Sequence, residues 1–138
     1  MNIAAEKRLS AEELMEPYRL QIERALKYTR GTHIWGDLVK GVRAAEMHFW
    51  PAEKSFLITE IMVFPQKRSL HVFLAGGDLD EIMEMRPSVE DFARRLECDF
   101  VTLAGRLGWK KVLSDNGYEA SWTYMAKDVS SGKRRTKS

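Results

Sequence analysis

Apolar residues recur at helical spacing through the first third of the chain. One face of a helix is marked by Leu14, Tyr18, Ile22, Ala25 and Leu26. Ser10-Ala-Glu-Glu13 has the form of a capping box, which predicts a helix start. Pro17 interrupts the pattern, so either a short turn precedes a helix that starts near Pro17 or one helix is kinked there. Gly31 ends this segment, and Thr32 is the expected cap of the next helix.

The period of the pattern changes from helical to alternating near residue 46. Before that point, a second helix face is marked by Trp35, Leu38, Val39 and Val42. After it, three runs rich in β-branched and aromatic residues predict strands over 46–50, 56–64 and 70–74. Their short connections, 51–54 and 65–68, predict an antiparallel meander.

The second half of the chain returns to mixed periods. After Gly76-Gly77, residues 78–85 are one helical turn or a loop, and a helix restarts over 86–96, with Pro87 near its first turn and Ser88 as a cap. A strand over 100–103, a short helix over 108–113 and a last strand over 118–126 follow. The order is therefore α-α-β-β-β-α-β-α-β. The crossover around 86–103 implies one parallel pair of strands, hence a mixed sheet.

Composition limits the classes of protein that fit. The 138 residues suit one domain, which we place at 1–128 with an N-terminal arm over 1–9. Cys98 is the only cysteine, so an internal disulfide and a multi-cysteine metal site are excluded. The three histidines show no ligand spacing, and no metal is expected. No apolar run approaches the ~18 residues of a membrane span, and residues 1–8 lack the apolar stretch of a signal peptide. We expect a protein that is neither secreted nor membrane-spanning.

The charge is concentrated at the C-terminal end. The net charge is +2, but the polar tail 129–138 carries four cations and no acid, so residues 1–128 are net acidic. The cations are Lys133, Arg134, Arg135 and Lys137. Such a tail is either a solubilising end or a contact for nucleic acid or an acidic protein surface. Four cations supply a weak, salt-sensitive contact without base readout.

Two sets of residues carry a family resemblance over about residues 17–128. The element order, together with the closing segment Leu107-Gly-Trp-Lys-Lys-Val-Leu-Ser-Asp-Asn-Gly-Tyr118, resembles the GNAT acyltransferase superfamily. Ile58–Pro65, Leu74–Leu79 and Leu103–Trp109 look like small GNAT-like proteins encoded by tailed bacteriophages. The resemblance implies an α/β (α+β) fold with a mixed sheet and helices on both faces.

In active members of that superfamily, a glycine-containing loop between a strand and a helix holds the pyrophosphate of coenzyme A with its amides. The equivalent place here is Gly76-Gly77, whose glycines are adjacent rather than spaced. Asp78, Asp80 and Glu81 follow, and these carboxylates would repel a diphosphate at a cost of about tenfold or more in affinity. An alternative alignment starts at Gln66-Lys67-Arg68, but no glycine follows.

The other candidate site residues each have a structural interpretation. Arg106 could clamp a phosphate, or it could lie over Trp109 or pair with Asp78 or Asp80. The resemblance implies a strand glutamate as base and a tyrosine as acid, for which Glu60 and Tyr124 are the candidates if the chain is an active enzyme. The acidic neighbours of Cys98 would raise its pKa, which is unsuited to a nucleophile.

These observations favour a non-catalytic GNAT-like phage protein, a virion component near the portal or inside the head that works through protein–protein contacts. Its partners would be other phage structural proteins, with a homo-oligomer and a weak tail contact to nucleic acid left open, and its location the virion or host cytoplasm. No cofactor is then expected. The alternative is an acetyl-CoA-dependent N-acyltransferase, with acetyl-CoA as cofactor.

Overall fold

The computed structural model describes residues 9–105, 109–121 and 125–130. By its internal contacts the chain divides into two units, Met1–Leu103 and Ala104–Ser138.

Three short helices, with 3₁₀ turns between them, form the N-terminal part of the first unit. The helices are α1 (Ala11–Met15), α2 (Arg19–Leu26) and α3 (Trp35–Arg43), and the 3₁₀ turns are η2 (Glu16–Tyr18) and η3 (Lys27–Thr29). The capping box is confirmed, because the Ser10 amide donates to the Glu13 carboxylate at 2.9 Å and the Glu13 amide donates to the Ser10 hydroxyl at 3.1 Å. Pro17 lies in η2, so a 3₁₀ turn separates two helices there.

The predicted cap of the third helix is wrong by two residues. The N-cap of α3 is Ile34, whose amide donates to the Asp37 carboxylate at 2.9 Å. The Thr32 hydroxyl instead hydrogen-bonds Nδ1 of His33 at 2.8 Å. Because Asp37 reaches back to the start of the helix, the helix needs no hydroxyl at its cap.

Among the described residues, the sheet has four strands in the order β1-β2-β3-β4. They are β1 (Met47–Pro51), β2 (Phe56–Val63), β3 (Arg68–Gly76) and β4 (Phe100–Leu103). The first three form the antiparallel meander that the alternating pattern predicted. The fourth pairs with β3 in parallel over four residues. The predicted mixed sheet is therefore confirmed.

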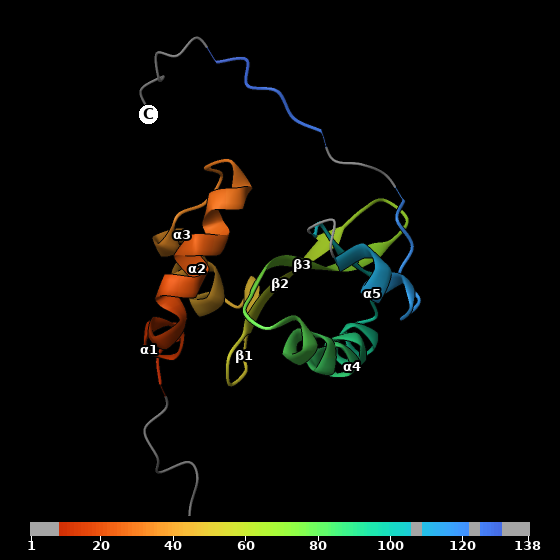
Figure 1. Cartoon of the computed structure of the whole chain (residues 1–138), viewed down its shortest axis with the longest axis horizontal. Coiled ribbons are helices and arrows are strands. Elements are labelled where there is room, and N and C mark those ends of the chain that lie inside the picture. Colours follow the sequence, from red (N-terminus) through yellow and green to blue (C-terminus); the bar gives the residue numbers. More distant parts are fainter. Residues whose placement is uncertain (1–8, 106–108, 122–124, 131–138) are drawn as a thin grey trace, which may run out of the picture. The chain divides into compact units, whose positions relative to one another are not determined.

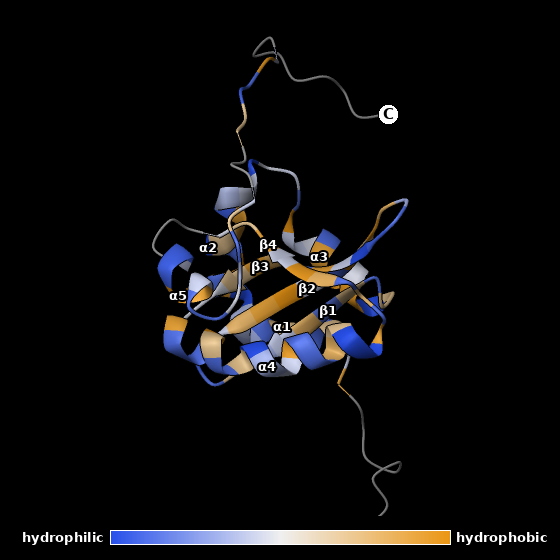
Figure 2. Cartoon of the chain, turned by 90° about the vertical axis from the view of Figure 1, so that its right-hand side faces the viewer, coloured by the Kyte–Doolittle hydropathy of each residue, from blue (hydrophilic) through white to orange (hydrophobic). Residues whose placement is uncertain are grey.

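Helices cover both faces of the sheet, as expected for a GNAT-like fold. Helices α1–α3 lie on one side and α4 (Leu79–Arg95) on the other (Figure 1). Side chains alternate between these faces: the ring of Phe49 packs against Tyr18 of η2, whereas the rings of His48 and Trp50 pack against Phe92 of α4. Figure 2 shows that β2, between the two layers, is coloured hydrophobic along most of its length. Fully buried core residues include Phe56 and Ile58.

Helix α4 is longer than predicted. The sequence suggested a restart at residue 86, but one helix runs over Leu79–Arg95 with Pro87 inside it. A proline in a helix interior removes one backbone hydrogen bond. The buried side chains of Ile82, Val89 and Ala93 lie on both sides of Pro87 along the helix. The free energy gained by packing this apolar face against the sheet outweighs the tendency of Pro87 to break the helix.

The described residues of the second unit include one short helix, α5 (Lys110–Ser114). The chain turns after it at Gly117, which has φ +89°, and the Tyr118 amide donates to the Leu113 carbonyl at 3.0 Å. The strand predicted over 118–126 is not formed at residues 118–121 and 125–126, and residues 122–124 lie outside the described part. Strand hydrogen bonds need a neighbouring strand, and within the described residues none pairs with this segment. Among those same residues, no helix is both long enough and apolar enough to cross a membrane.

Candidate functional site

The candidate phosphate loop is the junction between β3 and α4. Gly76 is the last residue of β3, and Asp78 is the N-cap of α4. A strand-to-helix junction of this kind presents backbone amides and the positive end of the helix dipole. The predicted position of this strand-to-helix junction is therefore confirmed.

The glycine turn is packed directly against the connection between β1 and β2. Gly77 has φ +113°, a conformation that other residues adopt only with strain. A Cβ atom at Gly77 would meet the Lys54 carbonyl oxygen and would lie 2.5 Å from the Ser55 hydroxyl and 2.6 Å from its Cα. A Cβ at Gly76 would lie 2.6 Å from the Phe56 ring. No loop is left free at this turn to wrap around a diphosphate.

Hydrogen bonds tie the same two segments together. The Asp78 amide donates to the Ser55 hydroxyl at 2.9 Å, and the Ser55 side chain is fully buried. The Lys54 amide donates to the Glu81 carboxylate at 2.7 Å. Asp78 and Glu81, at the start of α4, therefore hold the β1–β2 connection in place through these two hydrogen bonds.

The protein's own carboxylates surround the start of α4. The Asp78 carboxylate caps the helix by accepting from the Glu81 amide at 3.1 Å, and Asp80 and Glu81 lie in the first turn. Carboxylates at this position stabilise the helix through its dipole and repel a second anion. These residues do not fit the pyrophosphate of coenzyme A. Arg106, the cation suggested to face them, lies outside the described residues.

The alternative alignment at Gln66-Lys67-Arg68 is wrong. These residues belong to the hairpin between β2 and β3, where the Phe64 amide donates to the Lys67 carbonyl at 2.8 Å. A strand-to-strand turn has no helix N-terminus behind it, so it lacks the dipole that attracts phosphate.

Glu60 lies in β2, half-buried, between Met47 of β1 and His71 of β3 in the strand register. Burial lowers the pKa of His71, and the nearby Glu60 carboxylate acts in the opposite direction. Nδ1 of His71 also hydrogen-bonds the Thr102 hydroxyl at 3.0 Å, and Thr102 in turn contacts the Ser69 hydroxyl. Tyr124, the suggested acid partner of Glu60, lies outside the described residues.

The polar row around His71 was not found from the sequence. Its only signal is the alternation of each strand, which places His71, Ser69 and the paired residues Glu60 and Thr102 on one face once the register is known. Register between distant strands is a tertiary property. The three histidines and all other described residues contain no group of three ligands suited to a metal ion.

Cys98 is unsuited to nucleophilic chemistry. Burial raises the pKa of its thiol, with a smaller contribution from Asp99 in the same direction and an opposing one from Arg68. The predicted increase in the pKa of Cys98 is confirmed, although burial, and not the acidic neighbours, is its main cause.

Comparison with known proteins supports the fold. No family model matches the sequence, and no curated protein matches it significantly. Solved structures do match at low identity. An acetyltransferase from Trypanosoma brucei is 13% identical with a TM-score of 0.57, covering 83% of this chain and 94% of its own. A possible acetyltransferase from Clostridium difficile is 12% identical with a TM-score of 0.55, covering 90% and 95%. An aminoglycoside acetyltransferase from a soil metagenomic sample is 12% identical with a TM-score of 0.58, covering 90% and 95%. The chain therefore has a GNAT-like acetyltransferase fold.

Proposed function

We propose that this protein uses a GNAT-like fold for contacts with other proteins and not for acyl transfer. The observation that carries the proposal is the start of α4, where the Asp78 carboxylate caps the helix and Gly77 is packed against Lys54 and Ser55. A cofactor diphosphate would have to displace the protein's own anions and open a buried contact at the same time.

The setting that we propose is a tailed-phage particle, near the portal or inside the head. Support comes from the likeness of Ile58–Pro65, Leu74–Leu79 and Leu103–Trp109 to small phage proteins. Other structural proteins of the particle would be the partners. The cations over 133–137 would add a weak contact to an acidic surface or to nucleic acid.

An acetyl-CoA-dependent N-acyltransferase is the second candidate. Several of the similar solved structures are named as acetyltransferases or possible acetyltransferases. The carboxylate of Glu60, which pairs with His71 in the strand register, is the candidate base. In this version Glu60 would take the proton of the acceptor amine.

Two measurements separate the candidates. Incubation of the full chain with acetyl-CoA and a panel of primary amines should release no coenzyme A above the uncatalysed rate. Mass spectrometry of purified virions should find the chain at a fixed copy number. Turnover that is lost in Glu60→Gln would overturn the proposal, and a particle without the chain would overturn its setting.

A further inference from the structure

A groove lies between the edge strand β1 and the C-terminal half of α4. Its volume is about 480 Å³, and it is lined by Trp50, Ser88, Asp91, Arg94 and Arg95. Because a helix rises 1.5 Å per residue, Arg95 lies roughly 25 Å along α4 from the cap at Asp78. The groove is therefore separate from the glycine turn.

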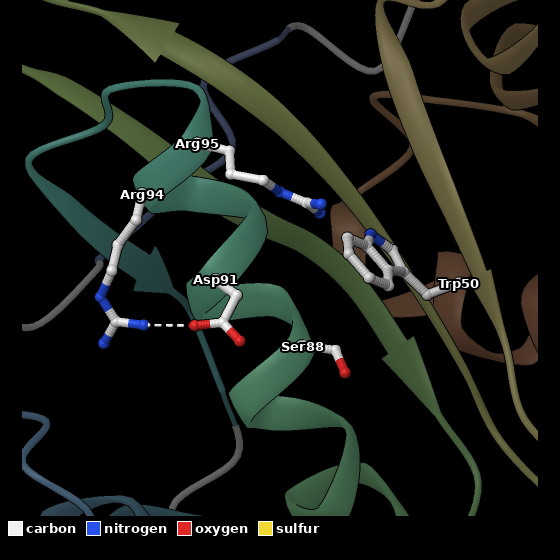
Figure 3. Close-up of a pocket in the computed structure, with 5 residues that line it drawn as sticks. All are labelled: Trp50, Ser88, Asp91, Arg94 and Arg95. Carbon is white, nitrogen blue, oxygen red and sulfur yellow. Dashed lines mark hydrogen bonds and ion pairs between the residues drawn. The ribbon is translucent and has the colours of Figure 1, made fainter.

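The two arginines of the groove differ in what they face. Figure 3 shows Arg95 extending from α4 toward the indole of Trp50, whereas Arg94 points to the other side of the helix. Arg94 is paired with the Asp91 carboxylate at 2.6 Å. The guanidinium of Arg95 lies 5.8 Å from the centre of the Phe92 ring. Within the described residues no carboxylate pairs with Arg95, so its charge is available to an outside anion.

Trp50 forms a fixed aromatic wall opposite Arg95. Its Nε1 donates to the Thr59 hydroxyl at 3.0 Å, and its ring packs edge-on against Phe92 with centroids 5.3 Å apart. A side chain held at both ends loses little freedom when it is covered, which favours its use in binding.

The edge of β1 beside this groove is unprotected. β1 is the terminal strand, and among the described residues no strand pairs with its outer edge. Natural edge strands are usually guarded by charged side chains, bulges or proline. Strand β1 (Met47–Pro51) contains no acid, lysine or arginine. Its only residue that discourages pairing with another strand is Pro51, at its end. Burial lowers the pKa of His48, which favours its uncharged form.

We infer that the β1 edge and the Arg95–Trp50 groove together bind an extended acidic segment of a partner protein, which adds a fifth strand to the sheet. Backbone hydrogen bonds to β1 would supply affinity, and alternate side chains would supply specificity. On the α4 side, a carboxylate would meet Arg95 and an apolar side chain would cover Trp50. The inference rests on the proposed function and names its partner class.

Charge favours this occupant over a second segment of the same chain. The C-terminal sequence of another copy would bring the four cations within 133–137, which Arg95 would repel. A partner strand that presents both an acidic and an apolar side chain on its α4-facing side is complementary to both walls of the groove.

The probe is a peptide of about nine residues, a typical strand length or slightly more, with glutamate and valine at alternate odd positions and threonine at every even position, so that one face of the strand presents both residue types. A lysine-for-glutamate version is its matched control. Fluorescence anisotropy with the full wild-type chain should show at least about tenfold tighter binding of the glutamate peptide. Hydrogen exchange should slow at amides within 47–51 when that peptide is bound.

Two charge reversals test where the peptide binds. Arg95→Glu should weaken binding of the glutamate peptide about tenfold or more, whereas Arg24→Glu, an exposed arginine on α2 across the sheet, should change it less than about twofold. Equal weakening by both variants, equal binding of both peptides, or no binding would overturn the inference. A dimer of the free chain that protects amides within 47–51 would also overturn the inference, because a second copy of the chain would then pair with the β1 edge. If the chain shows no acyl transfer and also fails to bind the peptide, the inference about the β1 edge is wrong, but the proposed non-catalytic function is not contradicted.

Discussion

Replacement of Gly77 by alanine tests whether the turn before α4 is closed. The new methyl group would meet the Lys54 carbonyl oxygen and would lie 2.5 Å from the Ser55 hydroxyl, and the backbone would keep φ at +113°. Two of the three nearest atoms are backbone atoms, so no flexible side chain can swing away to make room.

The magnitude follows from two separate costs. Backbone strain of this kind costs about 1–3 kcal/mol, and overpacking against atoms that cannot move adds about 1–3 kcal/mol. We therefore expect Gly77→Ala to lower the free energy of unfolding by about 3 kcal/mol or more. At roughly 4 °C per kcal/mol for a chain of this size, Tm should fall by roughly 10 °C.

Two other glycines separate the two costs. Gly31 has φ +77°, and a Cβ atom added there would have no other atom within 4 Å, so Gly31→Ala should show the strain alone, about 1–2 kcal/mol. Gly36 lies in α3 without positive φ and with open space, so Gly36→Ala should be neutral or stabilise by up to about 1 kcal/mol.

Urea unfolding followed by circular dichroism measures all three variants in the full chain. The expected order of stability is Gly36→Ala, then Gly31→Ala, then Gly77→Ala. If Gly77→Ala were no less stable than Gly31→Ala, the turn would not be packed against Lys54 and Ser55, and the argument for a closed junction would fail.

Three further predictions concern single side chains. Asp78→Ala should lower the free energy of unfolding by about 1 kcal/mol through loss of the cap, and Asp78→Asn should restore most of it; equal losses in urea titrations would deny the capping role. Because the pKa of folded His71 lies below its ordinary value of 6.5, the unfolded state takes up the proton first as pH falls, so stability should decline below about pH 6.5. His71→Gln should flatten that decline, and an unchanged slope would assign it to other groups. Since burial raises its pKa, Cys98 should react with an alkylating reagent more slowly than free cysteine at pH 8, and a faster reaction would contradict this.

Local patterns were enough to predict most of the elements. The capping box at Ser10, the β-branched and aromatic run over 56–64 and the helical spacing that begins at Trp35 each depend on neighbours within a few residues. The carboxylates after Gly77 could likewise be predicted to surround a helix start, because charge and helix polarity are properties of the same short segment.

Side-chain contacts that join distant segments could not be predicted, although the parallel pairing in the sheet could. Ser55 bonds Asp78 across 23 positions of sequence, and Trp50 faces Arg95 only because its side chain leaves β1 on the face of the sheet that α4 covers. Pro87 stays helical because burial on both sides of it outweighs its local preference. The strand expected over 118–126 had a strand-like pattern but finds no partner among the described residues.

The central claim is that the start of α4 is closed to a diphosphate by the protein's own groups, and titration with coenzyme A tests it most directly. Amide chemical shifts over 76–81 in the isotope-labelled full chain should stay unchanged, and calorimetry should show no saturable heat, up to millimolar coenzyme A. Shifts centred on Gly76 and Gly77 that saturate at micromolar coenzyme A would contradict the account.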